Sequence, residues 1–336
     1  MIMTTESFNH RRFHGQAGTY EVWYLTWNHA ATGQGFWLRY LAESPLHGPP
    51  RGELWFARFD PKDPSRTFGI HKHFEAPADR ESPFGLTIHT AQLGHDHAVG
   101  ELAGNGHVVH WNLHWEPAQH VLRQLPDVMY ARGGLGETTV LSPNPRVPLW
   151  GSVVVDGEML TFEHAVAGQS HVWGKKHAYS WVWGRCAEFA GAPDAVLELL
   201  GVRLRRGGFT TPKLFLATLE LDGETHDLSQ FRHVLGNRAT WGGCNAQFTA
   251  WSPTVRIEGE LTCRPEDMVN APYVDPDGTE LYCANTEIGD AMVRVYRRGV
   301  IGWREHRILV GTRRAHFELG GRERDPAVRR EHVLVD

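Results

Sequence analysis

Long apolar runs are absent from this sequence of 336 residues. No apolar stretch reaches the roughly 18 residues that a membrane-spanning helix needs, so we expect no transmembrane segment. The charged residues within residues 1–15 are not followed by an apolar segment, so we expect no signal peptide either. Together these features predict a cytoplasmic protein.

Cysteine is scarce, with four residues in the whole chain. None belongs to a CxxC pair, and the wide spacing predicts reduced, partly buried thiols, although it leaves disulfides open. The sequence also lacks the GxSxG motif of serine hydrolases and the Walker motif of nucleotide hydrolases. We therefore expect neither enzyme class, and we expect no cofactor and no bound metal. The cysteines are Cys186, Cys244, Cys263 and Cys283.

Basic clusters and long helical patterns are missing as well. The net charge is −5 with histidine neutral and there is no basic block, which argues against nucleic acid as a partner. The best helical signal is a short amphipathic segment at residues 119–125. The sequence is instead rich in segments with the pattern of β-strands. Its 41% apolar and 22% charged residues are typical of a globular protein.

Short alternating segments separated by turn residues run through the chain. Residues 20–27 and 36–41 predict a hairpin, and residues 106–115 alternate cleanly between apolar and polar side chains. Asp156-Gly157 and Asp222-Gly223 are typical of two-residue hairpin turns. No helical pattern separates the strands as parallel crossovers would require. We therefore predict an all-β fold made of two lipocalin-like antiparallel β-barrels, or strongly curved sheets, in tandem.

A segment rich in glycine and proline divides the predicted strands into two groups. Residues 133–148 contain little apolar material and predict a linker. On this basis residues 1–132 form an N-terminal barrel-like domain and residues 149–336 form a C-terminal one. The oligomeric state is not indicated by the sequence.

The densest group of chemically active residues lies between Gly168 and Phe189. Read with the period of a strand, three aromatic residues share one face and could line a cavity. Polar residues at odd positions around Gly174 precede them, as expected of a turn that points toward an aromatic wall. The alternative is a buried strand whose tryptophans fill core volume. The predicted ligand-binding residues are Gln169, Trp173, Lys175, His177, Tyr179, Trp181 and Trp183.

This segment carries a family resemblance. The residues GQSHVWGKKHAYSWVWG, with FWLRY early and AHFELGGR late in the chain, resemble the lipocalin-like family of carotenoid 1,2-hydratases, tocopherol cyclases and AttH-type proteins. The resemblance implies two calycin-like barrels in one chain. The hydratases carry an aspartate just before the motif histidine, whereas this chain has Ser170 before His171.

The resemblance and the residue types imply the same chemistry. Hydration or cyclisation of a prenyl chain needs a proton donor in a dry cavity and aromatic faces for the cation that forms. The candidate acids are His171, Glu163 and Glu188. We expect the protein to bind, and to transform without a cofactor, a hydrophobic isoprenoid-like or polyketide-like small molecule. The alternative is a non-catalytic carrier of such a molecule.

Two histidine pairs give a third, more distant hypothesis. His95 and His97, and likewise His110 and His114, are spaced so that alternate strand residues could share a metal ion. Solvent-facing histidines on half-exposed strands are the favoured interpretation.

Overall fold

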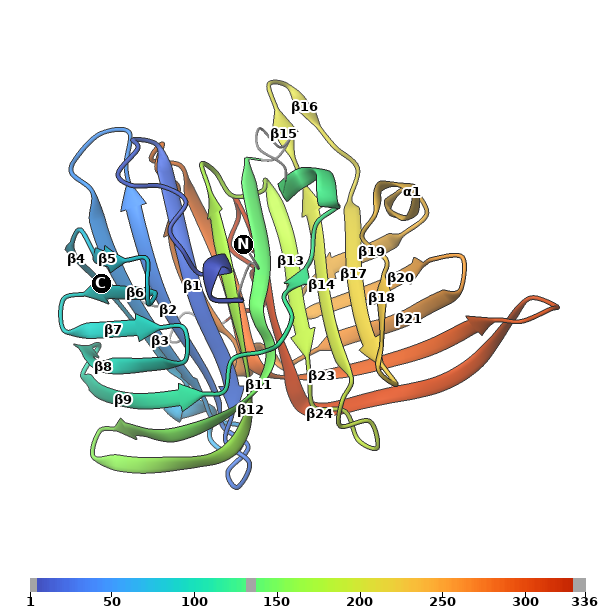
Figure 1. Cartoon of the computed structure of the whole chain (residues 1–336), viewed down its shortest axis with the longest axis horizontal. Helices are drawn as coiled ribbons and strands as arrows, with labels where there is room; N and C mark the ends of the chain where they lie inside the picture. Colours follow the sequence, from blue (N-terminus) through green and yellow to red (C-terminus); the bar gives the residue numbers. More distant parts are fainter. Residues whose placement is uncertain (1–4, 131–136, 329–336) are drawn as a thin grey trace.

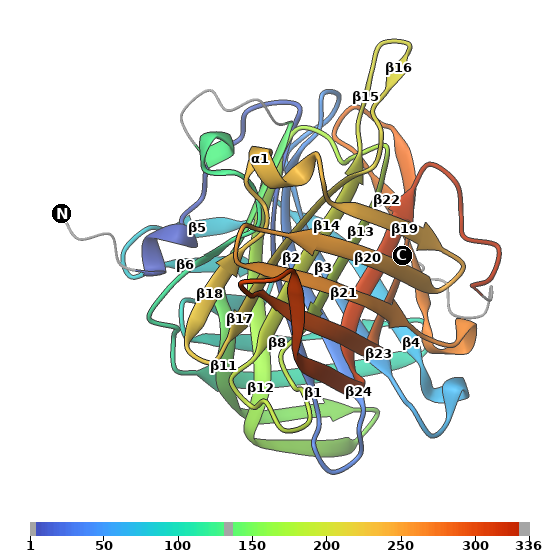
Figure 2. The same ribbon diagram turned by 90° about the vertical axis from the view of Figure 1, so that its right-hand side faces the viewer.

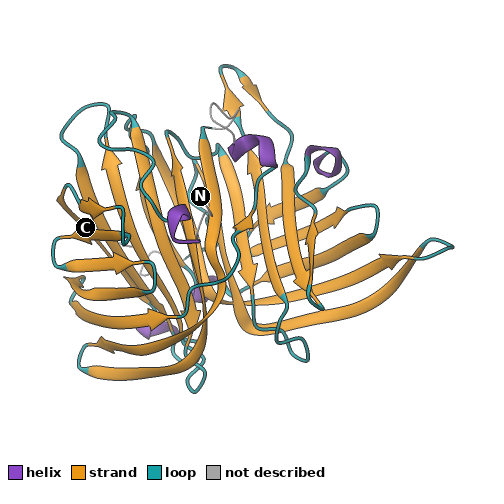
Figure 3. Ribbon diagram, in the orientation of Figure 1, coloured by secondary structure: helices purple, strands orange, loops and turns teal. Residues whose placement is uncertain are grey.

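The computed structural model describes residues 5–130 and 137–328, and almost all regular structure in this part of the chain is antiparallel strand (Figure 3). Two large curled sheets lie side by side, the first blue to green and the second green to red (Figure 1). The all-β tandem fold predicted from the sequence is therefore confirmed. No helix among the described residues has the length and apolar character needed to cross a bilayer.

The first sheet has twelve strands. In spatial order they are β4 (Phe68–Glu75), β3 (Arg51–Phe59), β2 (Gly35–Ser44), β1 (Thr19–Asn28), β12 (Glu158–Gly174), β11 (Thr138–Val155), β9 (His107–Trp115), β8 (His97–Gly104), β7 (Ala91–Gly94), β6 (Gly85–Ile88) and β5 (Ala78–Arg80), with β10 (Leu122–Arg123) paired to β11.

The second sheet has ten strands, and a small two-stranded sheet stands apart from it. In spatial order the ten are β18 (Glu224–Asp227), β17 (Leu214–Leu221), β14 (Val196–Arg203), β13 (Ser180–Cys186), β24 (Trp303–Gly321), β23 (Glu280–Arg298), β21 (Val255–Thr262), β20 (Asn245–Trp251) and β19 (Arg238–Gly242), with β22 (Val269–Val274) paired to β23. The small sheet is β15 (Arg205–Arg206) with β16 (Phe209–Thr210). The helical turns are α1 (Phe231–Val234), η1 (Thr5–Phe8), η2 (Pro64–Arg66), η3 (Asp127–Tyr130) and η4 (Pro265–Asp267).

Two-residue turns close several hairpins as the sequence predicts. Asp156-Gly157 joins β11 to β12 and Asp222-Gly223 joins β17 to β18, with all four residues at positive φ. That backbone conformation matches the twist of the flanking strands, which is why Asp-Gly pairs occur there.

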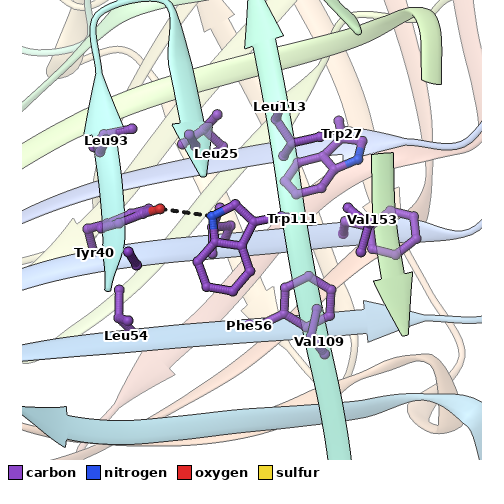
Figure 4. Close-up of a cluster of buried hydrophobic side chains, with 14 of the residues drawn as sticks. Leu25, Trp27, Tyr40, Leu54, Phe56, Leu93, Val109, Trp111, Leu113 and Val153 are labelled. Carbon is purple, nitrogen blue, oxygen red and sulfur yellow. Dashed lines mark hydrogen bonds between the residues drawn. The ribbon is translucent and has the colours of Figure 1, made fainter. Parts of the chain in front are cut away.

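Each sheet curls around its own apolar core. In the first sheet β4 approaches β8, and in the second β19 and β20 approach β17, as the crossing strands in Figure 2 show. The first core is rich in aromatic rings from β1, β2, β3 and β9 (Figure 4). Its one drawn hydrogen bond runs from the Trp111 indole to the Tyr40 hydroxyl at 2.9 Å, so the polar atoms of both rings are satisfied inside the core.

The central strands are buried on both faces because the two sheets also pack against each other. In β2, Phe36, Leu38 and Tyr40 face the first core, whereas Trp37 lies in a separate apolar cluster shared with the second sheet. Polar contacts cross this interface as well, since His316 Nε2 of β24 lies 2.7 Å from the Asn28 side chain of β1. The run of apolar residues in β2 follows from this double burial.

The segment predicted as a linker lies largely within β11. Residues 138–148 pair with β12, and the ladder is irregular between Leu141 and Asn144 and between Asn144 and Val147. Pro143 and Pro145 lie at these irregular positions, where a strand tolerates a missing N–H donor. Residues 131–136 lie outside the described residues, and the domain boundaries stay a prediction. The chain passes from the first sheet to the second between Gly174 and Ser180.

Candidate functional site

A partly enclosed cavity of about 180 Å³ lies where the two sheets meet. Strands β1, β2, β11 and β12 of the first sheet and β13, β14, β22 and β24 of the second contribute to its wall. The lining residues are Val22, Tyr24, Trp37, Arg39, Leu125, Met129, Glu137, Thr138, Val140, Val172, Lys176, His177, Ala178, Trp181, Trp183, Leu200, Val202, Leu204, Tyr273 and Glu318.

Aromatic rings form much of this wall. Tyr24 meets Trp183 edge to face at 5.4 Å between ring centroids, and Trp181 stacks on Tyr273 at 6.3 Å. Such pairs hold rigid flat surfaces at little cost in conformational entropy. The electron-rich faces can also stabilise a positive charge on a bound molecule.

Most charged groups on the wall are held by a partner. His177 Nδ1 lies 2.7 Å from Asp275 Oδ1, and the Lys176 ammonium donates to Asp277 at 2.5 Å. The Glu318 carboxylate accepts from the indole of Trp181 at 2.8 Å. These contacts fix the orientation of the polar side chains. The cavity is therefore mostly apolar, with a few polar groups in defined positions.

A chain of buried polar side chains runs from Tyr24 away from the cavity. Ser170 lies directly opposite Tyr24 on the ladder of β1 and β12. Ser170 Oγ lies 2.9 Å from Ser142 Oγ, and Ser142 Oγ donates to Glu198 at 3.5 Å. Glu198 also accepts from Gln124 at 2.8 Å. The chain therefore runs from a carboxyl group in the second sheet to Ser170, the ladder neighbour of Tyr24 on the cavity wall.

Burial raises the pKa of Glu198 to about 7, with the nearby Arg185 guanidinium acting in the opposite direction. The Arg185 Nε lies 3.4 Å from Glu198 Oε1, and the guanidinium also donates to the carbonyl of Pro145 at 2.7 Å. Burial likewise raises the pKa of Tyr24 well above its usual value, and the negative charges of Glu318 and Glu198 act in the same direction. Tyr24 therefore stays a protonated phenol, while Glu198 can carry or release a proton near neutral pH.

Three of the ten residues predicted from the sequence line the cavity, namely His177, Trp181 and Trp183. His171 is fully buried on the opposite face of β12, where its ring stacks on Trp23. The remaining predicted residues are placed elsewhere. Gln169, Trp173, Glu163 and Lys175 are on or just after β12, Tyr179 lies under Arg205, and Glu188 faces Arg314.

The strand alternation explains this division. On β12 the even positions Ser170 and Val172 point toward the interface between the sheets, whereas on β13 it is the odd positions Trp181 and Trp183 that point there. The segment from Lys175 to Tyr179 is not paired in either sheet, so the side-chain alternation of β12 does not continue into β13. A single alternation continued through Gly174, as the sequence suggested, therefore groups residues of opposite faces.

Sequence reasoning missed Tyr24, Arg39, Glu198 and Glu318. A usable signal existed for three of them, because Arg39, Glu198 and Glu318 are charged residues with an apolar or aromatic residue on each side. Such residues are rarely buried without a partner or a function. Tyr24 alternates with core tryptophans and gave no comparable signal.

The histidine pairs considered for metal binding have other partners. His95 bonds the Asn9 side chain at 3.0 Å, and His110 pairs with Glu101 on the exposed face of β9. Within residues 5–130 and 137–328, one group does bring metal-ligating atoms within 4.8 Å of one another, namely Glu53, His71 and His73. A carboxylate and two imidazoles form a ligand set that zinc accepts.

Comparison with known families fits this architecture. The model of the family described as tocopherol cyclase-like matches residues 144–321, more than half of the chain. This chain belongs to the tocopherol cyclase-like family. The matched region includes Ser170, Glu198 and Glu318, whereas Tyr24 and Arg39 come from strands before it.

Solved structures of the same fold cover almost the whole chain. An AttH protein of Nitrosomonas europaea has a TM-score of 0.57 at 14% identity, covering 93% of this chain and 95% of that one. CghA, solved with Sch210972, has a TM-score of 0.54 at 10% identity, covering 95% and 97%. Kievitone hydratase from Nectria haematococca has a TM-score of 0.51 at 10% identity, covering 95% and 94%. At these identities the likeness establishes the fold alone.

A relative in sequence extends along the chain as well. An uncharacterised protein of Mycobacterium tuberculosis is 27% identical over 315 residues, which are 92% of this chain and 88% of that protein. The similarity therefore includes both sheets and not the motif alone.

Proposed function

We propose that the cavity between the sheets binds a hydrophobic isoprenoid-like or polyketide-like molecule and transforms it by cofactor-independent hydration, cyclisation or isomerisation. The family is described as tocopherol cyclase-like, and one protein of the same fold is a hydratase. Both names favour reactions that add a proton to a carbon skeleton. The aromatic cavity wall supports the choice of an apolar substrate.

The observation that carries the proposal is the chain of hydroxyls between Glu198 and Tyr24. A hydroxyl both donates and accepts, so a proton can pass from Glu198 through Ser142 to Ser170, and from there to the phenol of its ladder neighbour Tyr24. Glu198 is the acid of this relay, because its pKa near 7 leaves much of it protonated at neutral pH. The high pKa of Tyr24 means that it passes a proton on only as it receives one.

The proposed step balances along this path. The Tyr24 O–H bond breaks as a C–H bond forms on the substrate, the serines shift their protons toward Tyr24, and Glu198 ends as a carboxylate. The cation on the substrate faces the rings of Trp181 and Trp183, each worth up to about 2 kcal/mol when desolvated. Addition of water, attack by a second double bond or loss of a proton then completes the three reaction types.

The position of Ser170 supports this assignment. The resemblance places an aspartate there in the carotenoid hydratases, and this chain has a hydroxyl instead. In the structure, Ser142 connects Ser170 to Glu198, so a carboxyl group from β14 is coupled to the same position. We therefore favour Glu198 over His171, Glu163 and Glu188 as the acid, because Glu198 is connected through Ser142 to Ser170 beside the cavity wall, whereas none of these three lines the cavity.

Deuterium transfer distinguishes an enzyme from a carrier. Native mass spectrometry of the purified protein identifies a co-purifying ligand, which is then incubated with the protein in D2O. An enzyme of this kind puts deuterium on carbon, with a rate that falls as the pH rises through about 7 because the acid loses its proton. A carrier returns the ligand unlabelled.

A matched pair of variants tests the relay itself. Glu198→Gln should lower the labelling rate at least a hundredfold while ligand still binds, since general acids typically contribute about 10²–10⁴-fold. Glu116→Gln, which changes an exposed glutamate just after the end of β9 and outside the cavity lining, should leave the rate unchanged. Equal labelling by Glu198→Gln and the unaltered protein would rule out Glu198 as the proton source.

A further inference from the structure

One charged side chain on the cavity wall is buried in an unusual setting. Arg39 lies in the middle of β2, is 3% exposed, and points away from the first core toward the second sheet. Its neighbours across the ladder are Tyr24 on β1 and Trp55 on β3. It lines both the main cavity and a smaller adjoining one of about 10 Å³.

The guanidinium of Arg39 has aromatic contacts in place of acceptors. Its central carbon lies 4.2 Å from the ring centroid of Tyr273 and 5.2 Å from that of Trp55. Among the described residues it has no hydrogen bond and no ion pair, and Nη1 is buried without a partner. Removing a charge from water costs several kcal/mol, and a cation–π contact returns about 2 kcal/mol. An acceptor for this group is therefore missing from the protein.

Three nearby carboxylates are already engaged. Among those of the main cavity, Glu318 accepts from Trp181 at 2.8 Å. Beside the smaller cavity, Glu53 lies 3.1 Å from His71, and Glu43 pairs with Arg51 at 2.6 Å. The other buried cation-forming groups of the wall, Lys176 and His177, have acidic partners of their own. Arg39 differs from these groups in having no oppositely charged partner among the described residues.

We infer that the ligand of this cavity carries an anionic oxygen group, such as a carboxylate or an enolate, and that Arg39 binds it. The inference rests on the proposed function and names its substrate class as hydrophobic acids. A guanidinium offers a planar fork of donors that matches two acceptor oxygens. The surrounding rings fix that fork, while Val172, Leu200 and Val202 take the apolar body.

The register of the sheet also places the reacting bond. Tyr24 and Arg39 are directly paired on β1 and β2, so their Cβ atoms lie about 5 Å apart. The anionic group bound by Arg39 is therefore held close to the proton-donating hydroxyl. The substrate class that fits is an unsaturated acid or acidic polyketide whose double bond lies within a few bonds of its acidic group.

Geranate and geraniol test this inference, because they share one isoprenoid skeleton and differ in the charged group. Their affinities are measured by calorimetry at pH 7.5 with the unaltered protein, Arg39→Met and the control Arg294→Met. We expect at least tenfold tighter binding of geranate by the unaltered protein. Arg39→Met should abolish that preference and keep geraniol binding, while Arg294→Met should keep the preference because Arg294 is exposed on β23, where it pairs with Glu305, and does not line the cavity.

The unliganded proteins give an independent readout. Arg39→Met removes a buried charge that has no acceptor, so its melting temperature should equal or exceed that of the unaltered protein. A clear fall would mean that Arg39 has a purely structural role and would overturn the inference. Equal affinity for geranate and geraniol would overturn it while leaving an apolar binding cavity in place. Binding of neither molecule would count against the ligand-binding function as well.

Discussion

Two histidines, one on β12 and one in the connection after it, have nearly the same chemical partners and very different surroundings. His171 lies 3.0 Å from a Glu21 oxygen and stacks on Trp23 at 4.7 Å. His177 lies 2.7 Å from an Asp275 oxygen and stacks on Tyr20 at 4.6 Å. The first is sealed inside the protein, whereas the second is on the wall of the cavity.

The difference shows that a histidine–carboxylate pair does not by itself mark an active site. The other ring nitrogen of His171 is used by the backbone carbonyl of Phe8 at 2.6 Å, so both nitrogens are committed within the protein. His177 keeps an edge toward the cavity, because only its Nδ1 is bound to Asp275. Access to a ligand therefore distinguishes the two residues, and their partners do not.

The largest effect should come from the sealed pair. His171→Ala should lower the free energy of unfolding by about 3 kcal/mol, because it opens a cavity and leaves the Phe8 carbonyl and one Glu21 oxygen without this partner. Urea denaturation measures the change. Geraniol affinity, measured well below the unfolding midpoint, should stay as in the unaltered protein.

The opposite pattern would restore a functional role for His171. If His171→Gln kept the melting temperature within a few degrees and removed deuterium transfer, His171 would belong to the reaction. The buried position and the two filled hydrogen-bonding positions make a structural role the expected outcome.

Much of the fold followed from local rules of sequence. The hairpin of β1 and β2 and the Asp-Gly turns formed as predicted, and so did the alternation of β9, because each depends on residues close together in the chain. Whether residues 138–148 form a strand or a linker depended on residues far away in the sequence. Prolines there favoured a linker, and pairing with β12 makes most of the segment a strand.

The site was only partly predictable for the same reason. Trp181, Trp183 and His177 were found because they lie in one dense segment. Glu198 was not, since it meets Ser142, and through it Ser170, only after β14 of the second sheet packs against β11 and β12 of the first. A cavity between two sheets is formed by tertiary packing, which strand periodicity does not describe.

A smaller effect, of the opposite kind, should come from the pair on the cavity wall. His177→Ala should cost about 1 kcal/mol in stability, because Asp275 keeps its bond from the backbone N–H of residue 177 at 3.0 Å. Geraniol affinity should fall several-fold, since the ring forms part of the lining. If the affinity stayed unchanged and the stability fell as much as in His171→Ala, His177 would have a structural role like that of His171.

The smallest effect should come from a third pair, on the solvent-facing side of β9. His110 Nδ1 lies 3.2 Å from a Glu101 oxygen, with both side chains about half exposed at 52% and 56%. Exposed ion pairs contribute about 0–1 kcal/mol because water and salt screen them. His110→Ala should therefore change the free energy of unfolding by less than about 0.5 kcal/mol and leave geraniol affinity untouched. The same measurement with added zinc tests the remaining alternative for this strand, which is metal binding. If zinc stabilised the unaltered protein, and if His110→Ala and His114→Ala each abolished that stabilisation, β9 would carry a metal site. Equal stabilisation of all three proteins would place any bound zinc elsewhere.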